Sequence, residues 1–172
     1  NGEIYNYLEI KQELQSLGYQ FRTRGDTEVL AVALQEWGPE ALDRMEGMWA
    51  FAWYDETSSQ LLLSRDRFGE KPLYLWNLPE GLFFASEVKG LAALSGRWPE
   101  LNQNHLLRYL VNGYKSLYKT KETFYQGVWE MPSGTNLLIS ADGQRQEKCY
   151  WTPHLQVQEN WNFTDSVEAI RS

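Results

Sequence analysis

The chain of 172 residues is 42% hydrophobic and 23% charged, an ordinary composition for one soluble globular domain with a substantial core. The net charge of −7 argues against nucleic acid or an anionic membrane as a partner, and no apolar run approaches the length that crosses a bilayer. One cysteine rules out an intrachain disulfide framework and favours a cytoplasmic location. Together with two histidines it is too little for an ordinary zinc site, so we expect no metal.

The first predicted element is a turn at Asn1-Gly2. Both residues tolerate positive φ, and Asn-Gly is the strongest two-residue hairpin signal. Such a turn brings the Gly2 N–H and the Asn1 carboxamide to one point, where two donors can stabilise a developing oxyanion, and Glu3 follows with a carboxylate. The alternative, a plain hairpin turn followed by a solvated acid, is favoured by the first six residues alone. Because a hairpin needs a strand before it and the sequence starts without Met, we expect a piece of a longer protein.

Two helices joined by a short strand are expected next. Apolar residues at helical spacing predict a helix over 7–17 that ends at Gly18, and the alternation in 19–21 predicts a strand. A longer helix follows over 27–37. Asp26 stands directly before it, where a carboxylate either caps the helix or faces a pocket, and position alone favours the cap.

Four predicted strands follow with short connections, which indicates an antiparallel meander. The first, over 48–54, is apolar throughout, as expected for a strand covered on both faces. Helices are expected after the meander, and then three strands, of which the last two pair across Asp142-Gly143. The remaining elements are expected as strands over 61–64, 73–76, 82–86, 128–130, 136–139 and 147–151, helices over 39–45, 86–91 and 104–110, and the start of a helix over 163–170.

Four motifs, each weak alone, occur in order at sensible spacing. They are Asn1-Gly2-Glu3-Ile4-Tyr5-Asn6, Gly25-Asp26-Thr27-Glu28-Val29, Arg65-Asp66-Arg67-Phe68-Gly69-Glu70-Lys71-Pro72-Leu73-Tyr74 and Ser86-Glu87-Val88-Lys89. Together they resemble the glutaminase domain of bacterial glutamine-hydrolysing asparagine synthases, class II glutamine amidotransferases with the N-terminal-nucleophile hydrolase fold. The resemblance implies an α+β fold, an αββα sandwich of two antiparallel sheets between helical layers, incomplete at its N-terminus. It further implies a glutaminase domain over 1–151 without its first strands, and a linker with the start of a synthetase domain over 152–172.

The resemblance also implies a reaction and its partners. An N-terminal cysteine attacks the side-chain amide of L-glutamine with its own α-amino group as base, which gives a glutamyl thioester and ammonia. The ammonia passes to an ATP-dependent synthetase domain of the same chain, where it attacks an aspartyl-adenylate to form asparagine. ATP and Mg²⁺ belong to that second domain, so no cofactor is expected in this chain. A homodimer is left open.

Four residues carry over from the family by position. Asn1, through its side-chain amide, and Gly2, through its backbone N–H, match the oxyanion donors. Glu3 matches a residue that binds the amino-acid part of glutamine, and Asp26 matches the acid that pairs with the glutamine α-amino group. The chemistry agrees, because a zwitterionic substrate needs an anion for its ammonium, and hydrogen bonds to charged groups contribute about 1.5–3 kcal/mol.

The sequence also departs from the family. The nucleophilic cysteine and the glutamine-binding arginine are missing, and Cys149, in a predicted late strand without a terminal amine, cannot replace the nucleophile. We therefore expect the chain as given to be inactive, and sustained ammonia release from glutamine would contradict this. Two alternatives remain open: an amidotransferase of the same fold that acts on another acceptor, and a relative without a nucleophile that serves as an interaction module.

Other polar residues receive structural interpretations. Arg65 and Asp66 are expected to form an ion pair that holds the bend after them. Neither His105 nor His154 has a carboxylate or cysteine at useful spacing, so both are interpreted as surface or helix residues. The segment 86–89, with Glu87 and Lys89, has the composition of a helix start.

Overall fold

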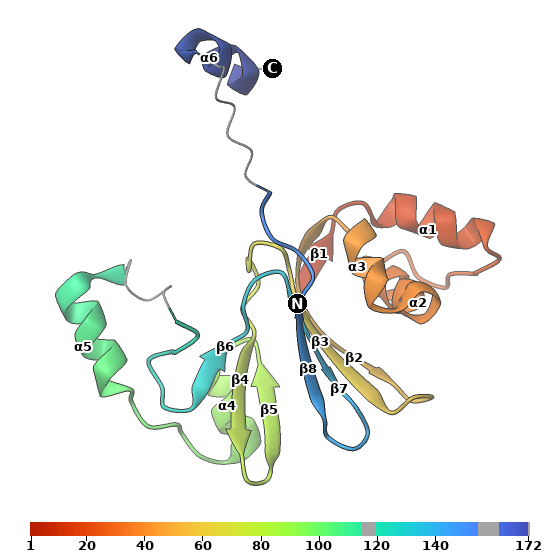
Figure 1. Cartoon of the computed structure of the whole chain (residues 1–172). Helices are drawn as coiled ribbons and strands as arrows, with labels where there is room; N and C mark the ends of the chain where they lie inside the picture. Colours follow the sequence, from red (N-terminus) through yellow and green to blue (C-terminus); the bar gives the residue numbers. More distant parts are fainter. Residues whose placement is uncertain (115–119, 155–161, 172) are drawn as a thin grey trace.

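The computed structural model describes residues 1–114, 120–154 and 162–171. Two antiparallel sheets pack against each other, and helices cover their outer faces (Figure 1). The layers follow the order helices, sheet, sheet, helices, which is the αββα sandwich predicted from the sequence.

The larger sheet consists, in spatial order, of β1 (Gly2–Ile4), β2 (Gly47–Asp55), β3 (Gln60–Arg65), β7 (Thr135–Ile139) and β8 (Arg145–Cys149). Strands β1 and β8 therefore form its two edges. Strand β2 pairs with β1 through residues 47–49 and with β3 through residues 50–55. Strand β2 therefore lies between β1 and β3, with β1 along its first residues on one side and β3 along its later residues on the other.

The smaller sheet consists, in spatial order, of β5 (Gly81–Ala85), β4 (Tyr74–Leu78) and β6 (Val128–Glu130). The outer face of the larger sheet is covered by α1 (Tyr7–Ser16), α2 (Asp26–Trp37), the 3-10 helix η1 (Gly38–Glu40) and α3 (Ala41–Arg44). The outer face of the smaller sheet is covered by α4 (Val88–Ser95), and α5 (Gln103–Asn112) and α6 (Phe163–Arg171) follow along the chain. Among the described residues, no helix has both the length and the apolar character needed to cross a membrane.

Alternation along the strands divides the core into layers. Leu62 of β3 joins the cluster beneath α1–α3, whereas its neighbour Leu63 joins the cluster between the two sheets. In the same way Leu75 of β4 lies between the sheets and Trp76 lies in the cluster beneath α4. Because successive side chains of a strand point to opposite faces, an apolar run of this kind is buried only where both faces of the sheet are covered.

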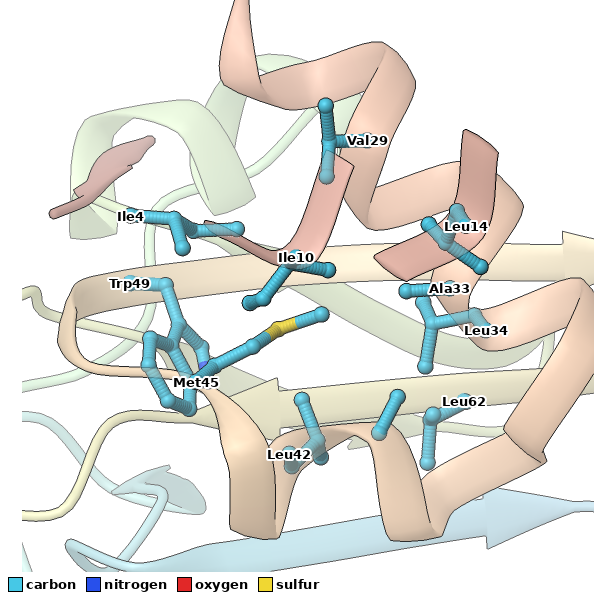
Figure 2. Packing of buried hydrophobic residues seen from close by; sticks show 11 residues of the cluster. Ile4, Ile10, Leu14, Val29, Ala33, Leu34, Leu42, Met45, Trp49 and Leu62 are labelled. Atoms are coloured by element: carbon cyan, nitrogen blue, oxygen red, sulfur yellow. The ribbon is translucent and has the colours of Figure 1, made fainter. Parts of the chain in front are cut away.

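Figure 2 shows the cluster beneath the first three helices. Ile10 of α1 and Val29 and Leu34 of α2 meet Trp49 and Leu62 of the larger sheet, and each of the five is at most 3% exposed. Full burial of a side chain of this size contributes about 1.5–3 kcal/mol. The cluster therefore fixes α1 and α2 on the sheet, and with them the segments that precede each helix.

Three expectations about the strands are wrong. The strands do not form one meander, because the chain leaves the larger sheet after β3, which pairs instead with β7 from much later in the sequence. Residues 19–21 form no strand; Tyr19 and Phe21 alternate because both pack, partly buried, against the helical cluster. The second half of β2 is not covered on both faces, since Ala52 and Tyr54 are exposed beyond the edge of the facing layers.

Candidate active site

The candidate site is built on β1, an edge strand at the position where the sequence predicted a hairpin turn. Gly2 lies opposite Trp49 of β2, with a φ of +144°. A Cβ at Gly2 would lie 2.2 Å from the Met48 carbonyl oxygen, and a Cβ at Gly47 would lie 2.2 Å from the Glu3 carbonyl oxygen. The two backbones therefore approach so closely that only glycine fits at both positions. Gly2 thus serves a close strand contact and not a turn.

The hydrogen-bond alternation of β1 directs the Gly2 N–H away from β2. The Asn1 amino group donates to the Ala50 carbonyl oxygen at 3.1 Å, and the Ala50 N–H donates to the Asn1 carbonyl oxygen at 2.8 Å. Because these residues form a hydrogen-bonded pair, Gly2 belongs to the next, non-hydrogen-bonded pair, whose N–H groups point outward. Ile4 shows the same direction, since its N–H donates to Asp26 Oδ2 at 3.0 Å. The Gly2 N–H therefore faces the side of β1 on which Asp26 lies.

Asp26 links helix α2 to β1. It is the first residue of α2, and the N-cap position belongs to Gly25, whose backbone is extended. Of the two roles left open for Asp26, the cap that position alone favoured is therefore not the one it has. Its Oδ2 accepts the Ile4 N–H, and its Oδ1 accepts the Thr27 hydroxyl at 3.4 Å. A carboxylate in the first turn of a helix also interacts favourably with the helix dipole.

The segment that leads into α2 is held by Glu28. Its carboxylate accepts the N–H of Arg22 at 2.9 Å and the N–H and hydroxyl of Thr23 at 2.7 and 2.6 Å. These bonds, led by the one from Arg22, lower the pKa of Glu28 to about 2. From the other side, Lys11 of α1 donates to the Thr23 carbonyl oxygen at 2.9 Å. The loop before α2 is therefore held by side chains of both helices.

A cavity of about 300 Å³ opens beside β1, and this volume lies at the lower end of ordinary ligand pockets. The residues that line it are Gly2, Glu3, Tyr7, Arg24, Gly25 and Asp26. Three of the four residues carried over from the family, Gly2, Glu3 and Asp26, thus share one cavity. Asn1, the fourth, is not among the lining residues; it is exposed at the end of the strand, next to Gly2.

Tyr7 and Arg24 were not predicted to belong to the site. Tyr7 was interpreted only as part of the apolar stripe of a helix, and Arg24 carries no signal except its place two residues before Asp26. With them the cavity offers two carboxylates, a guanidinium, a phenol and one outward-facing backbone N–H. This set suits a small zwitterion that also carries a hydrogen-bond acceptor. Among the described residues, no group of three or more His, Cys, Asp or Glu side chains is placed to hold a metal ion.

A larger cavity of about 670 Å³ lies elsewhere, at the smaller sheet and residues 120–124. Arg65 and His105 are among its lining residues, and none of the four carried-over residues is. His105, interpreted as a surface or helix residue, lies in α5 but is only 2% exposed, with its ring edge-to-face with Phe124. Because size alone does not define a site, we assign the site to the smaller cavity, where the predicted residues meet.

Arg65 and Asp66 do not pair with each other as predicted. Arg65 forms an ion pair with Glu130 at 2.7 Å. The Asp66 carboxylate, buried at 1% exposure, instead accepts four backbone N–H groups at 3.0–3.2 Å. These donors belong to Trp49, Phe68, Glu70 and Lys71. Since the Trp49 N–H points away from β1, Asp66 completes the hydrogen bonding of β2 beyond the end of β3 and supports the strand on which β1 rests.

Cys149, the one cysteine of the sequence, lies at the opposite edge of the larger sheet. It ends β8, four strands away from β1, which corresponds to about 19 Å at about 4.8 Å per strand. The thiol is exposed, and its Sγ lies 3.2 Å from the Trp151 carbonyl oxygen. This distance excludes Cys149 as an attacking group for the cavity beside β1, in agreement with the sequence interpretation.

The fold defines a class of protein. A solved structure of the same architecture is the glutamine phosphoribosylpyrophosphate amidotransferase of Bacillus subtilis, with a TM-score of 0.61, 21% identity, and coverage of 89% of this chain and 28% of its own. A structure titled as an allosteric regulatory enzyme of purine biosynthesis is as similar, with a TM-score of 0.62 and 21% identity over the same shares. At such identity the similarity shows the fold alone, which is the N-terminal-nucleophile hydrolase fold of glutamine amidotransferases.

The sequence comparison then gives the family. Residues 1–151 match the model of the glutamine amidotransferase domain, and the chain belongs to this family. A Mycobacterium bovis protein, provisionally named a glutamine-hydrolysing asparagine synthetase, is 40% identical over 83% of this chain and 22% of its own length. The glutamine-hydrolysing asparagine synthetase 1 of Bacillus subtilis is 34% identical over 99% of this chain and 27% of its own length. The chain thus spans about a quarter of the length of these curated relatives.

Proposed function

We propose that this chain is the glutaminase part of a glutamine-hydrolysing asparagine synthase. In the intact enzyme this part hydrolyses the side-chain amide of L-glutamine and supplies the ammonia to an ATP-dependent synthetase domain that amidates aspartate, whereas the chain as given, without the nucleophilic cysteine, is inactive. Family membership supports the glutaminase activity, and the names of the relatives support aspartate as the acceptor. In this proposal residues 1–151 form the glutaminase domain, and residues 152–172 lead toward the synthetase domain.

The observation that carries the proposal is the meeting of Gly2, Glu3 and Asp26 in one cavity at the open edge of β1. The carboxylates of Glu3 and Asp26 bind the α-ammonium group of glutamine. Because Asp26 Oδ2 is engaged by the Ile4 N–H at 3.0 Å, the direction of this carboxylate is set before the substrate arrives. Charge-assisted hydrogen bonds of this kind contribute about 1.5–3 kcal/mol.

Gly2 and Asn1 act at the reacting amide. The N–H of Gly2 points away from β2, and the Asn1 carboxamide stands next to it in the chain. Both donate to the amide oxygen as it becomes negatively charged. A donor fixed by a strand contact needs no reorganisation during the reaction, and a single donor of this type contributes roughly 10²–10³ in rate. The close approach of β1 and β2 thus serves the chemistry directly.

The attacking group in the proposed reaction is a cysteine thiolate that is not among the residues of this sequence, since Cys149 is too far from the cavity. Its sulfur bonds to the amide carbon, the C–N bond breaks, and the nitrogen leaves as ammonia after it takes up a proton. Water then attacks the thioester, which releases glutamate and restores the thiol. In both steps the residues of this chain hold the ammonium group and stabilise the oxyanion.

Isothermal titration calorimetry of the chain with L-glutamine tests the proposal. Asp26→Asn and Glu3→Gln should each raise Kd by about tenfold or more, because each removes a charge-assisted contact worth about 1.5–3 kcal/mol. The Asp26→Asn side chain retains an oxygen for the Ile4 N–H, so that α2 stays attached to β1.

Glu9→Gln is the matched control for these variants. Glu9 is exposed on α1, does not line the cavity, and loses the same single charge. It should bind glutamine like the wild-type chain. The proposal would be contradicted by a wild-type chain that does not bind glutamine, or by Asp26→Asn and Glu3→Gln variants that bind it as tightly as Glu9→Gln does.

A further inference from the structure

We propose that the larger cavity, of about 670 Å³, and Phe68 at its rim form the surface on which the synthetase domain of the intact enzyme docks. This docking surface rests on the proposed function, because it needs a synthetase domain after residue 151. It is separate from the glutamine site, since neither Gly2, Glu3 nor Asp26 lines the larger cavity. Three features of the structure support it: the lining of the cavity, the exposure of Phe68, and the place at which the chain leaves the domain.

The apolar part of the lining comes from several segments of the chain. Phe68 belongs to the bend after β3, and Tyr74 begins β4. Phe124 precedes β6, and Met131 and Pro132 follow it. Apolar surface gathered in this way is a typical mark of an interaction site, because its burial contributes about 25 cal/mol per Å².

Each of the four acidic or basic residues in the lining already has an ion-pair partner. The pairs are Arg65 with Glu130 at 2.7 Å, Lys121 with Glu147 at 2.6 Å, and Glu122 with Arg108 at 3.6 Å. A charged metabolite would have to compete with these pairs, whereas uncharged and apolar side chains of a protein would not. The lining therefore suits a protein surface better than a charged small molecule.

Phe68 presents an aromatic ring at a fixed place on the rim. Its N–H donates to Asp66 Oδ1 at 3.0 Å, and the Gly69 N–H donates to the Asp66 carbonyl oxygen at 3.2 Å. The ring packs edge-to-face against Trp151, with 4.9 Å between the ring centroids, yet Phe68 remains 71% exposed. Aromatic side chains are enriched in the cores of protein interfaces, so a held and exposed ring of this kind is suited to anchor a partner.

The chain leaves the domain beside this cavity. The match to the amidotransferase family ends at residue 151. The N–H groups of Tyr150 and Trp151 donate to the Gly134 carbonyl oxygen at 2.8 and 3.3 Å. Ser133, directly before Gly134, lines the cavity, and Trp151 contacts Phe68. A domain that follows residue 151 therefore starts at the edge of the cavity.

The length of the relatives makes such a domain available. The chain spans only 22% and 27% of the length of the Mycobacterium bovis and Bacillus subtilis relatives. A domain joined directly to residue 151 is held near the cavity at a high effective concentration, so that even a modest apolar contact keeps it docked.

A second copy of the chain is the competing occupant, because an exposed apolar surface can also be covered by its own kind. The two occupants separate by concentration. A contact within one polypeptide does not depend on the protein concentration, whereas a contact between two copies is lost on dilution.

Hydroxyl-radical footprinting with mass spectrometry tests the proposal without any substitution. It measures the oxidation rate of Phe68 in the chain as given and in the intact enzyme, each at a high and a low protein concentration. Tyr54 is the matched control, since it is an aromatic residue near the end of β2, is 56% exposed and does not line the cavity. Phe68 should be oxidised about fivefold or more slowly in the intact enzyme at both concentrations, as expected for a ring in the buried core of an interface. Tyr54 should be oxidised at the same rate in both proteins.

Two results would overturn the docking surface and leave the proposed function standing. The first is equal oxidation of Phe68 in the chain and in the intact enzyme. The second is protection of Phe68 that disappears on dilution, which would assign the surface to a second copy.

An activity measurement on the same intact enzyme tests the proposed function separately. Failure to form asparagine from glutamine, aspartate and ATP would end the proposed function. The assignment of the docked domain as a synthetase would fail with it.

Discussion

A methyl group at Gly47 tests whether the close contact between β1 and β2 holds the candidate site. Gly47 has a φ of +145°, and a Cβ there would lie 2.2 Å from the Glu3 carbonyl oxygen and 3.0 Å from the Ile4 Cα. Real Cβ atoms essentially never come closer than 3.0 Å, so β1 would have to move by at least 0.8 Å, the difference between 3.0 and 2.2 Å. Gly47→Ala should therefore detach or displace the strand that carries Gly2 and Glu3.

Gly81 separates this collision from the strain of a positive φ. It has nearly the same φ, +147°, and a Cβ there would meet nothing within 4 Å. Gly81→Ala should then lower the free energy of unfolding only through the strain of an alanine at positive φ, by about 1–3 kcal/mol. Gly47→Ala suffers the same strain and also the collision with β1, which costs about 1–3 kcal/mol or more. The free energy of unfolding should therefore fall by about 2–6 kcal/mol in total. This is a large part of the roughly 5–15 kcal/mol that stabilises a domain.

Urea unfolding followed by tryptophan fluorescence measures both losses on the same chain, and the free energies follow from the midpoint and slope of each transition. The expected result is a loss at Gly47 that clearly exceeds the loss at Gly81, together with weaker glutamine binding only for the Gly47 variant. Equal losses of stability in the two variants would refute the reasoning, because they would mean that the contact between β1 and β2 contributes nothing beyond the strain of the backbone.

Two further predictions concern the groups that support the site. Asp66→Asn should lower the free energy of unfolding in urea by about 2–5 kcal/mol, because an amide NH₂ replaces one oxygen that accepts two backbone N–H groups. A loss below about 1 kcal/mol would contradict the role given to Asp66. Because folding lowers the pKa of Glu28 from 4.5 to about 2, its contribution to stability is complete above about pH 4.5 and is lost as the pH falls toward 2. The stability difference between the wild-type chain and Glu28→Gln should therefore shrink between about pH 5 and pH 2, and a difference that does not change with pH would argue against these hydrogen bonds.

The larger part of the fold could be predicted from the sequence because it depends on neighbouring residues. The helical spacing of Ile10 and Leu14 places them in the core, as α1 shows, and the Asp142-Gly143 turn joins β7 to β8 as predicted. Both patterns act over a few residues, where the 3.6-residue period of a helix and the geometry of a short turn leave few alternatives. The family motifs gave the layer order as well, since they imply a known architecture.

The candidate site could be predicted only in part. Gly2, Glu3 and Asp26 were correctly expected to share a cavity, but this expectation came from the resemblance and not from the residues themselves. Arg24 was missed because an exposed arginine before a helix has no pattern that distinguishes it from a solvated one. The pairing of Arg65 with Glu130, 65 residues later, was missed because the neighbouring Asp66 offered a nearer partner in the sequence.

By itself, the sequence determined where most helices lie, that a hairpin joins β7 to β8, and which family the chain resembles. Only the tertiary structure decided that Gly2 belongs to a strand and not to a turn. A glycine at positive φ occurs in turns and also at close contacts between strands, and the three residues of β1 are too few to show the alternation of a strand. It also decided that β3 pairs with β7 and that Asp26 reaches Ile4 across 22 residues. Contacts of this kind depend on how buried faces of distant segments fit together, and no short stretch of sequence contains both partners.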